Sequence, residues 1–290
     1  MEGLASCQWI WVIASMGCGL LALFLRGLRW RRLLLPVDET TTRRLSIAAY
    51  CVGNLCNCAL PTSGEWVRCG LATRKNDRFN RVLGTAASER IIDLLTLGGI
   101  LALLALFGWR FIGRFVTQNI IQPFVNYWEQ PGILMNILLA LALLAALVAL
   151  FWFAARKFRV WERIKKFLVG VVEGVASIRQ MPGKRWFIVD TTAIWLLYML
   201  QVMCISLALG LGLLPKDAML LSALGSIASV IPVPGGIGAY HYIIALSLGS
   251  LYGMEWGVGL LFATLCHESQ LLVSIVSGAA SWLILPARKS

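Results

Sequence analysis

The feature that most constrains this chain is a series of long apolar runs separated by basic segments. The runs cover 9–25, 86–107, 133–153, 187–209 and 257–285. About 20 apolar residues in a helix cross the ~30 Å hydrocarbon core of a bilayer, so each run is long enough for one span. Charged residues make up only 14% of the 290 residues, against roughly 25% in a soluble domain. The sequence therefore predicts an all-α, polytopic membrane protein with a single transmembrane domain over 1–290.

The basic residues predict the orientation of the spans. Lysine and arginine number six in 26–44, five in 64–82 and nine in 154–185, with two more at the carboxyl end. Segment 108–131 has only two lysines or arginines, and segment 211–217 has only one. Because lysine and arginine concentrate in cytoplasmic loops, we expect a multi-pass inner-membrane protein with a cytoplasmic carboxyl terminus. The net charge of +12 is distributed between the spans, so the expected partner is the anionic membrane surface and not nucleic acid.

Two shorter apolar stretches predict helices that enter the membrane and return. Stretch 46–60 has 15 residues and basic sequence on both sides, and as a helix it is about 22 Å long. Stretch 218–231 has 14 residues, or about 21 Å. It ends at helix-breaking prolines and glycines, and a second apolar leg follows at 242–252. By the charge count, the first re-entrant helix starts on the cytoplasmic side and the second on the external side.

The order of these elements predicts an inverted repeat. The half-repeat 1–107 has a span, a cytoplasmic hairpin and a span, and the half-repeat 186–290 has the same elements in the opposite orientation. Residues 108–185 supply a linking span and a basic amphipathic linker on the cytoplasmic side. Broken helices in matching positions of inverted halves are typical of transporters with a site near the bilayer midplane.

Both re-entrant helices break at a similar pattern. Pro-x-x-Gly occupies 61–64 and 232–235, and each break follows a helix of small residues that contains a glycine, Gly53 or Gly225. Backbone groups that end inside hydrocarbon need protein or water around them. The two breaks therefore predict a polar cavity.

Charged residues next to the first break are candidate site residues. Glu65 and Arg68 lie one helical turn apart, so they share a helix face. One interpretation is a solvated ion pair at the membrane interface. The other is that Arg68 offers a phosphate two parallel hydrogen bonds while Glu65 orients the arginine.

A second charged group begins the run at 86–107. Glu89, Arg90 and Asp93 lie in its first turns, and the run continues apolar to Phe107. Charges within a span normally face a partner or a wet cavity. Structural pairing of Asp93 with Arg90 or Arg68 is one alternative. A headgroup or proton site is the other.

His267 and Glu268 lie near the middle of the last apolar run. They are interpreted either as a buried pair that joins helices or as a titratable pair that couples proton movement to transport. His241, just beyond the second break, is interpreted as structural. No second histidine follows at the spacing of a helical zinc motif, so neither a metal site nor a cofactor is expected.

Three motifs together carry a family resemblance that covers nearly the whole chain. They are LPTSGEWVR (60–68), SERIIDLL (88–95) and IPVPGGIGAYH (231–241). These motifs resemble the Pro-x-x-Gly-Glu-x-x-Arg, Glu-Arg-x-x-Asp and Pro-Gly-Gly-x-Gly signatures of the flippase-like membrane domain of lysylphosphatidylglycerol synthases. The resemblance implies a lipid-handling membrane protein with two opposed re-entrant helices, whose larger relatives translocate aminoacylated phosphatidylglycerol.

The resemblance also implies which residues bind the substrate. Together with the pair in the last run, the candidates are Glu65, Arg68, Glu89, Arg90, Asp93, Gly235, Gly236, Gly238, His267 and Glu268. The chain departs from the family where Ala239–His241 stands in place of a common Arg-Glu, and where His267–Glu268 replaces a commonly arginine-containing segment. The soluble aminoacyl-transferase domain of the larger relatives is missing, so aminoacylation is not expected.

These observations favour a flippase or scramblase for a phosphate-bearing lipid, either an anionic phospholipid or a polyprenyl-linked phosphate. No catalytic residue is assigned, and a transporter is expected rather than an enzyme. The alternatives are an intramembrane transferase acting on polyprenyl lipids and a non-catalytic subunit of an envelope-biogenesis complex. A homo-oligomer is compatible with each of them.

Overall fold

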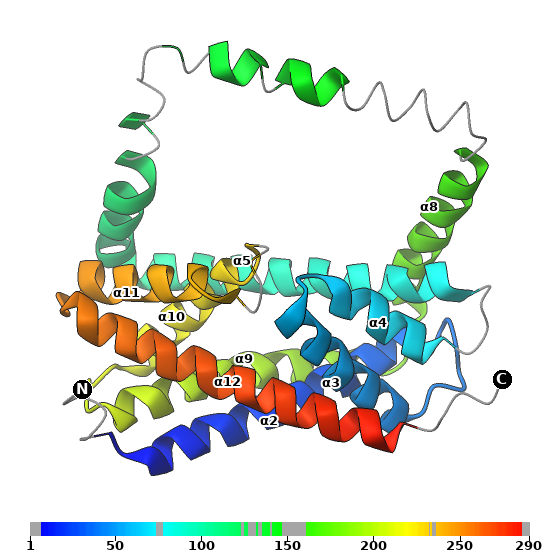
Figure 1. The fold of residues 1–290 in the computed structure, drawn as a ribbon, viewed down its shortest axis with the longest axis horizontal. Coiled ribbons are helices and arrows are strands. Elements are labelled where there is room, and N and C mark those ends of the chain that lie inside the picture. Colours follow the sequence, from blue (N-terminus) through cyan, green and yellow to red (C-terminus); the bar gives the residue numbers. More distant parts are fainter. Residues whose placement is uncertain are drawn as a thin grey trace.

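The computed structural model describes residues 7–73, 78–122, 125–126, 132, 135–139, 141–146, 161–231, 233 and 236–285. Within these residues the secondary structure is helical, with no strand, and this confirms the predicted all-α fold (Figure 1). The principal helices are α2 (Trp9–Leu34), α3 (Arg43–Ala59), α4 (Ser63–Ala72), α5 (Phe79–Val116), α8 (Trp161–Ala176), α9 (Lys184–Ala208), α10 (Pro215–Ala228), α11 (Ala239–Tyr252) and α12 (Trp256–Ile284). A π-helical turn, η2 (Thr117–Ile121), follows α5, and a 3-10 turn, η3 (Ser177–Gln180), follows α8.

Helices α2, α9 and α12 are each long and apolar enough to cross a membrane. They have 26, 25 and 29 residues, which corresponds to about 38–44 Å. The predicted run 86–107 lies within α5. Of the predicted run 133–153, the structure describes 135–139 and 141–146, and both stretches are helical.

Small residues let the long helices approach closely, as is usual between membrane helices. A Cβ atom on Gly27 of α2 would lie 2.7 Å from the Cα of Ile47 in α3. A Cβ on Gly278 of α12 would lie 2.5 Å from the Cβ of Leu55, also in α3. Helix α3 is therefore held between α2 and α12.

Helices α3 and α4 form the first hairpin. Thr42 caps the start of α3 because its side chain accepts a hydrogen bond from the Leu45 backbone N–H at 3.2 Å. At the break, Thr62 has a left-handed φ of 64°. The two legs then approach so closely that a Cβ on Gly64 would lie 2.0 Å from the carbonyl oxygen of Gly53. Glycine at both positions is what lets this hairpin close.

Helices α10 and α11 form the second hairpin. Pro215 begins α10, and the Asp217 carboxylate accepts a hydrogen bond from the Leu214 backbone N–H at 3.0 Å. Gly225 of α10 faces the ring of Tyr240 on α11, and a Cβ on Gly225 would lie 2.6 Å from that ring. Both glycines that the sequence singled out thus lie where two legs of a hairpin meet. Entry of the hairpins from opposite membrane faces, the inverted repeat and its half-repeat boundaries stay predictions.

Candidate functional site: a cavity between two hairpins

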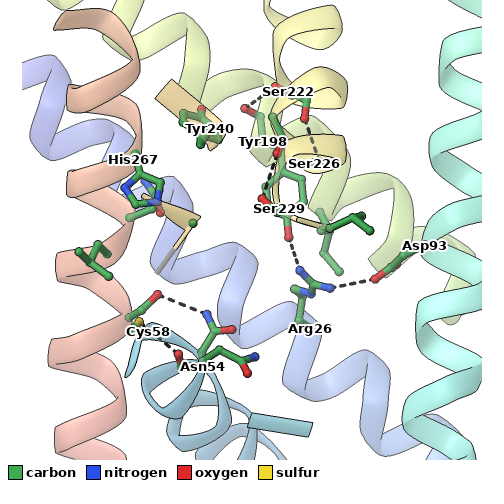
Figure 2. Close-up of a pocket in the computed structure, with 18 of the residues that line it drawn as sticks. Arg26, Asn54, Cys58, Asp93, Tyr198, Ser222, Ser226, Ser229, Tyr240 and His267 are labelled. Atoms are coloured by element: carbon green, nitrogen blue, oxygen red, sulfur yellow. Dashed lines mark hydrogen bonds and ion pairs between the residues drawn. The ribbon is translucent and has the colours of Figure 1, made fainter. Parts of the chain in front are cut away.

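A cavity of about 770 Å³ lies between the two hairpins. Its lining includes Pro61 and Thr62 from the first break, and Ser229, Val233 and Gly236 from the second. Helices α2, α5, α9 and α12 supply the remaining walls (Figure 2). The volume falls within the range of about 300–1,000 Å³ that is typical of small-molecule sites. The two sequence breaks therefore face one common space.

Uncharged polar side chains are interspersed with apolar ones on the cavity wall. Besides Tyr50 and Tyr198, they include Ser15, Asn54, Asn57, Thr62, Gln201, Ser222, Ser226, Ser229, Gln270 and Ser274. Asn57 also fixes the first break, because its Oδ1 accepts a hydrogen bond from the Gly64 backbone N–H at 2.8 Å. Because the apolar part of the wall is larger than the polar part, the cavity offers apolar contacts together with a few hydrogen-bonding groups.

Glu89 is the buried centre of a charged cluster behind this wall. Its side chain is fully buried. Its Oε2 accepts a 2.6 Å hydrogen bond from Nη1 of Arg68. Its Oε1 accepts bonds from Nη2 of Arg29 at 3.0 Å and from the Tyr50 hydroxyl at 3.1 Å. The Arg68 guanidinium lies over the rings of Trp30 and Tyr50, at 4.7 and 4.6 Å from their centroids, where cation–π attraction also stabilises its charge.

Asp93 connects this cluster to the cavity. Its Oδ1 lies 2.7 Å from Nη2 of Arg29, and its Oδ2 accepts a hydrogen bond from Nη2 of Arg26 at 2.8 Å. Nη1 of Arg26 donates to the Tyr198 hydroxyl at 2.8 Å. Arg26, Asp93 and Tyr198 all line the cavity (Figure 2).

Arg90 and Glu65 form an ion pair at the edge of the cavity. The Arg90 side chain is 52% exposed, whereas that of Glu65 is 18% exposed. The pair joins α5 to the first turn of α4, directly after the first break.

We call the seven charged residues of this region the arginine network: Arg26, Arg29, Arg68, Arg90, Glu65, Glu89 and Asp93. Four guanidinium groups face three carboxylates, so the network has one positive charge in excess. A charge in low-dielectric surroundings interacts strongly with its neighbours. The excess positive charge belongs to the buried part behind the wall, because the four charged network residues that line the cavity cancel one another.

The structure places the predicted site residues in three environments: at the cavity wall, buried behind this wall, and in an exposed position. Glu65, Arg90, Asp93, Gly236 and His267 line the cavity.

Arg68 and Glu89 lie behind the cavity wall, where both side chains are at most 4% exposed. Gly236 and Gly238 both have left-handed φ angles, of 76° and 92°, which glycine adopts without strain. Glu268 is beside His267 with its side chain 46% exposed, and Gly235 lies outside the described residues.

The ion pairs that the sequence suggested for Asp93 and Arg68 were wrong, because both residues have other partners in the structure. Asp93 pairs with Arg26 and Arg29 of α2 rather than with Arg90 or Arg68, and Arg68 pairs with Glu89 rather than with Glu65. The charge count had assigned Arg26 and Arg29 to a cytoplasmic loop, but both lie inside α2. Their spacing of three residues was the available signal, because it places both on one helix face.

The fold and the cavity together define an α-helical membrane protein whose two hairpins enclose a cavity lined in part by arginines. Comparison with protein families assigns the chain to one of them. The family described as "Lysylphosphatidylglycerol synthase TM region" matches residues 1–278, so the chain belongs to this family. Comparison with curated proteins and with solved structures gave no significant match.

Proposed function

We propose that this protein translocates a phosphate-bearing lipid, an anionic phospholipid or a polyprenyl phosphate, between the leaflets of the inner membrane. The observation that carries the proposal is the cavity of about 770 Å³, which both hairpin breaks line and which borders a charge network with one positive charge in excess. Family membership supports a lipid-associated role. In this account the hairpins are re-entrant helices from opposite faces, and the carboxyl terminus is cytoplasmic.

Arg26 is the residue best placed to bind the phosphate. It lines the cavity, its side chain is 21% exposed, and each of its Nη atoms carries a second hydrogen besides the one donated to Tyr198 or Asp93. A guanidinium group can donate two parallel hydrogen bonds to a phosphate. Arg90, which is half exposed at the cavity edge, is the second expected phosphate ligand.

Arg29, Arg68, Glu89 and Asp93 position Arg26. Asp93 and the Tyr198 hydroxyl each hold one Nη atom of Arg26, and Asp93 is itself held by Arg29. Arg68 neutralises Glu89 at 2.6 Å. Arg68 is therefore proposed as a supporting residue and not as a phosphate ligand, because it does not line the cavity.

The direct test is leaflet exchange in reconstituted vesicles. The protein is inserted into vesicles that contain a fluorescent phosphatidylglycerol or a fluorescent phosphatidylcholine, and a membrane-impermeant quencher reports the lipid that reaches the outer leaflet. We expect the protein to accelerate exchange of the anionic probe, and Arg26→Gln to remove most of that acceleration.

Arg81→Gln is the matched control, because Arg81 forms an exposed ion pair with Glu173. Monodisperse wild-type protein that leaves exchange of phosphatidylglycerol and of a polyprenyl-phosphate probe unchanged would contradict the proposal. Chemical conversion of the polyprenyl probe would point instead to a transferase.

A further inference from the structure

The two histidines of this chain are brought together by the second hairpin. The sequence contains only His241 and His267. His241 lies in the first turn of α11 and His267 lies in α12, yet their ring centroids are 5.0 Å apart. Glu268 lies beside them, and one ligand atom from each of the three residues falls within 4.8 Å of the others.

The distances within this group resemble those of a metal site. Nδ1 of His267 lies 3.1 Å from Oε1 of Glu268, and Nε2 of His241 lies 3.9 Å from the same oxygen. A tetrahedral zinc ion with bonds of about 2.0–2.2 Å holds its ligand atoms roughly 3.3–3.5 Å apart. Small side-chain movements would therefore bring the three atoms around one ion.

The surroundings leave room for the group and give access to it. A Cβ atom on Gly236 would lie 3.2 Å from Nε2 of His267, so glycine at this position keeps space for the imidazole. The Tyr240 ring packs 5.4 Å from the His267 ring. His267 lines the cavity, while the Glu268 side chain is 46% exposed.

We propose that His241, His267 and Glu268 bind a divalent transition metal ion of the zinc class. Two imidazoles and one carboxylate form a ligand set that zinc accepts, with a fourth position left for water or a substrate oxygen. Binding through Nε2 of His241 requires the ring proton on Nδ1, which gives up the contact from the Gly238 backbone N–H. That contact is long, at 3.4 Å, so its loss is a small penalty.

The site rests on the geometry of these three residues and not on lipid transport. Where the proposed function also holds, the ion would add positive charge at the wall of the cavity, on the side of the second hairpin. A phosphate oxygen is a suitable fourth ligand there.

Cobalt(II) titration of the detergent-purified full chain tests the proposal without any lipid. Cobalt is a spectroscopic probe for zinc sites, and its charge-transfer bands separate thiolate ligands from imidazole and carboxylate ligands. This matters because eight cysteines are present. We expect one cobalt ion to bind per chain, with no thiolate charge-transfer band in the spectrum. Added zinc should displace the cobalt and should raise the Tm of the protein.

Variants locate the site. We expect His241→Asn, His267→Asn and Glu268→Gln each to weaken cobalt binding by at least ~10-fold. Glu255→Gln, a carboxylate at the start of α12, should leave the affinity unchanged. Because Glu268 is half exposed, Glu268→Gln remains decisive if a histidine variant fails to fold. Wild-type protein that binds no cobalt below millimolar concentration, or variants that bind as tightly as wild type, would overturn the proposal.

Discussion

Nη2 of Arg26 donates a 2.8 Å hydrogen bond to Oδ2 of Asp93, and this contact joins α2 to α5 at the cavity wall. The two residues are 67 positions apart in the sequence. Their contact holds the Arg26 guanidinium at the cavity that both hairpin breaks line.

Removing the Glu89 carboxylate should destabilise the fold more than any change at an exposed charge. Glu89→Gln leaves Arg68 and Arg29 without their shared counter-charge in a fully buried position. Breaking such a buried pair costs about 3–5 kcal/mol. Thermal unfolding in detergent should show a large drop in Tm. Glu173→Gln breaks the exposed pair with Arg81 and should change stability by less than ~1 kcal/mol; equal losses in the two variants would contradict the buried network.

Arg90→Gln should slow lipid exchange without lowering the stability of the fold. The side chain is 52% exposed, so its ion pair with Glu65 contributes at most ~1 kcal/mol to stability. We expect Tm to change little, while exchange of an anionic lipid slows more than exchange of a zwitterionic lipid. Equal slowing of both lipids would argue against a phosphate contact at Arg90.

Gly64→Ala should open the first hairpin. A Cβ at this position would lie 2.0 Å from the Gly53 carbonyl oxygen, so the legs must separate, and overpacking of this kind typically costs about 1–3 kcal/mol. Gly70 lies in the same helix, α4, and no atom of the described residues beyond its own neighbours lies within 4 Å of its added Cβ. Gly70→Ala is therefore the matched control. The measurement is Tm of the two variants in detergent, and a Gly70→Ala loss as large as that of Gly64→Ala would contradict the close approach.

The bases of the two hairpins should be labelled from opposite membrane faces. In a cysteine-free background, Arg44→Cys and Lys216→Cys place one thiol near the start of α3 and of α10, where both side chains are exposed. A membrane-impermeant maleimide added outside cells should reach Lys216→Cys, while Arg44→Cys should react only in inside-out vesicles. Labelling of both positions from the same side alone would contradict opposed entry.

Patterns local in sequence predicted the helical fold and the hairpin glycines correctly. Gly53 and Gly225 were recognised because each precedes a Pro-x-x-Gly break, and the structure shows each at the meeting of two legs. The ion-pair partners were not predictable in this way. Arg26 and Arg29 follow an apolar run directly, so a count of basic residues placed them in a loop, although α2 continues to Leu34.

The cluster around His267 was missed for a related physical reason. A search for metal ligands within one helix compares neighbouring residues, but His241 comes from α11 and His267 from α12. Only the packing of the second hairpin against α12 brings the two rings within 5.0 Å. Tertiary contact, and not sequence spacing, defines this group.

The most direct test of the central claim is an experimental structure of the protein in lipid nanodiscs that contain an anionic phospholipid. We expect both hairpins to end inside the bilayer, one from each face, with headgroup density within hydrogen-bond distance of the Arg26 guanidinium. A hairpin that crosses the whole bilayer, or a cavity closed by side chains with no headgroup near Arg26, would contradict the account.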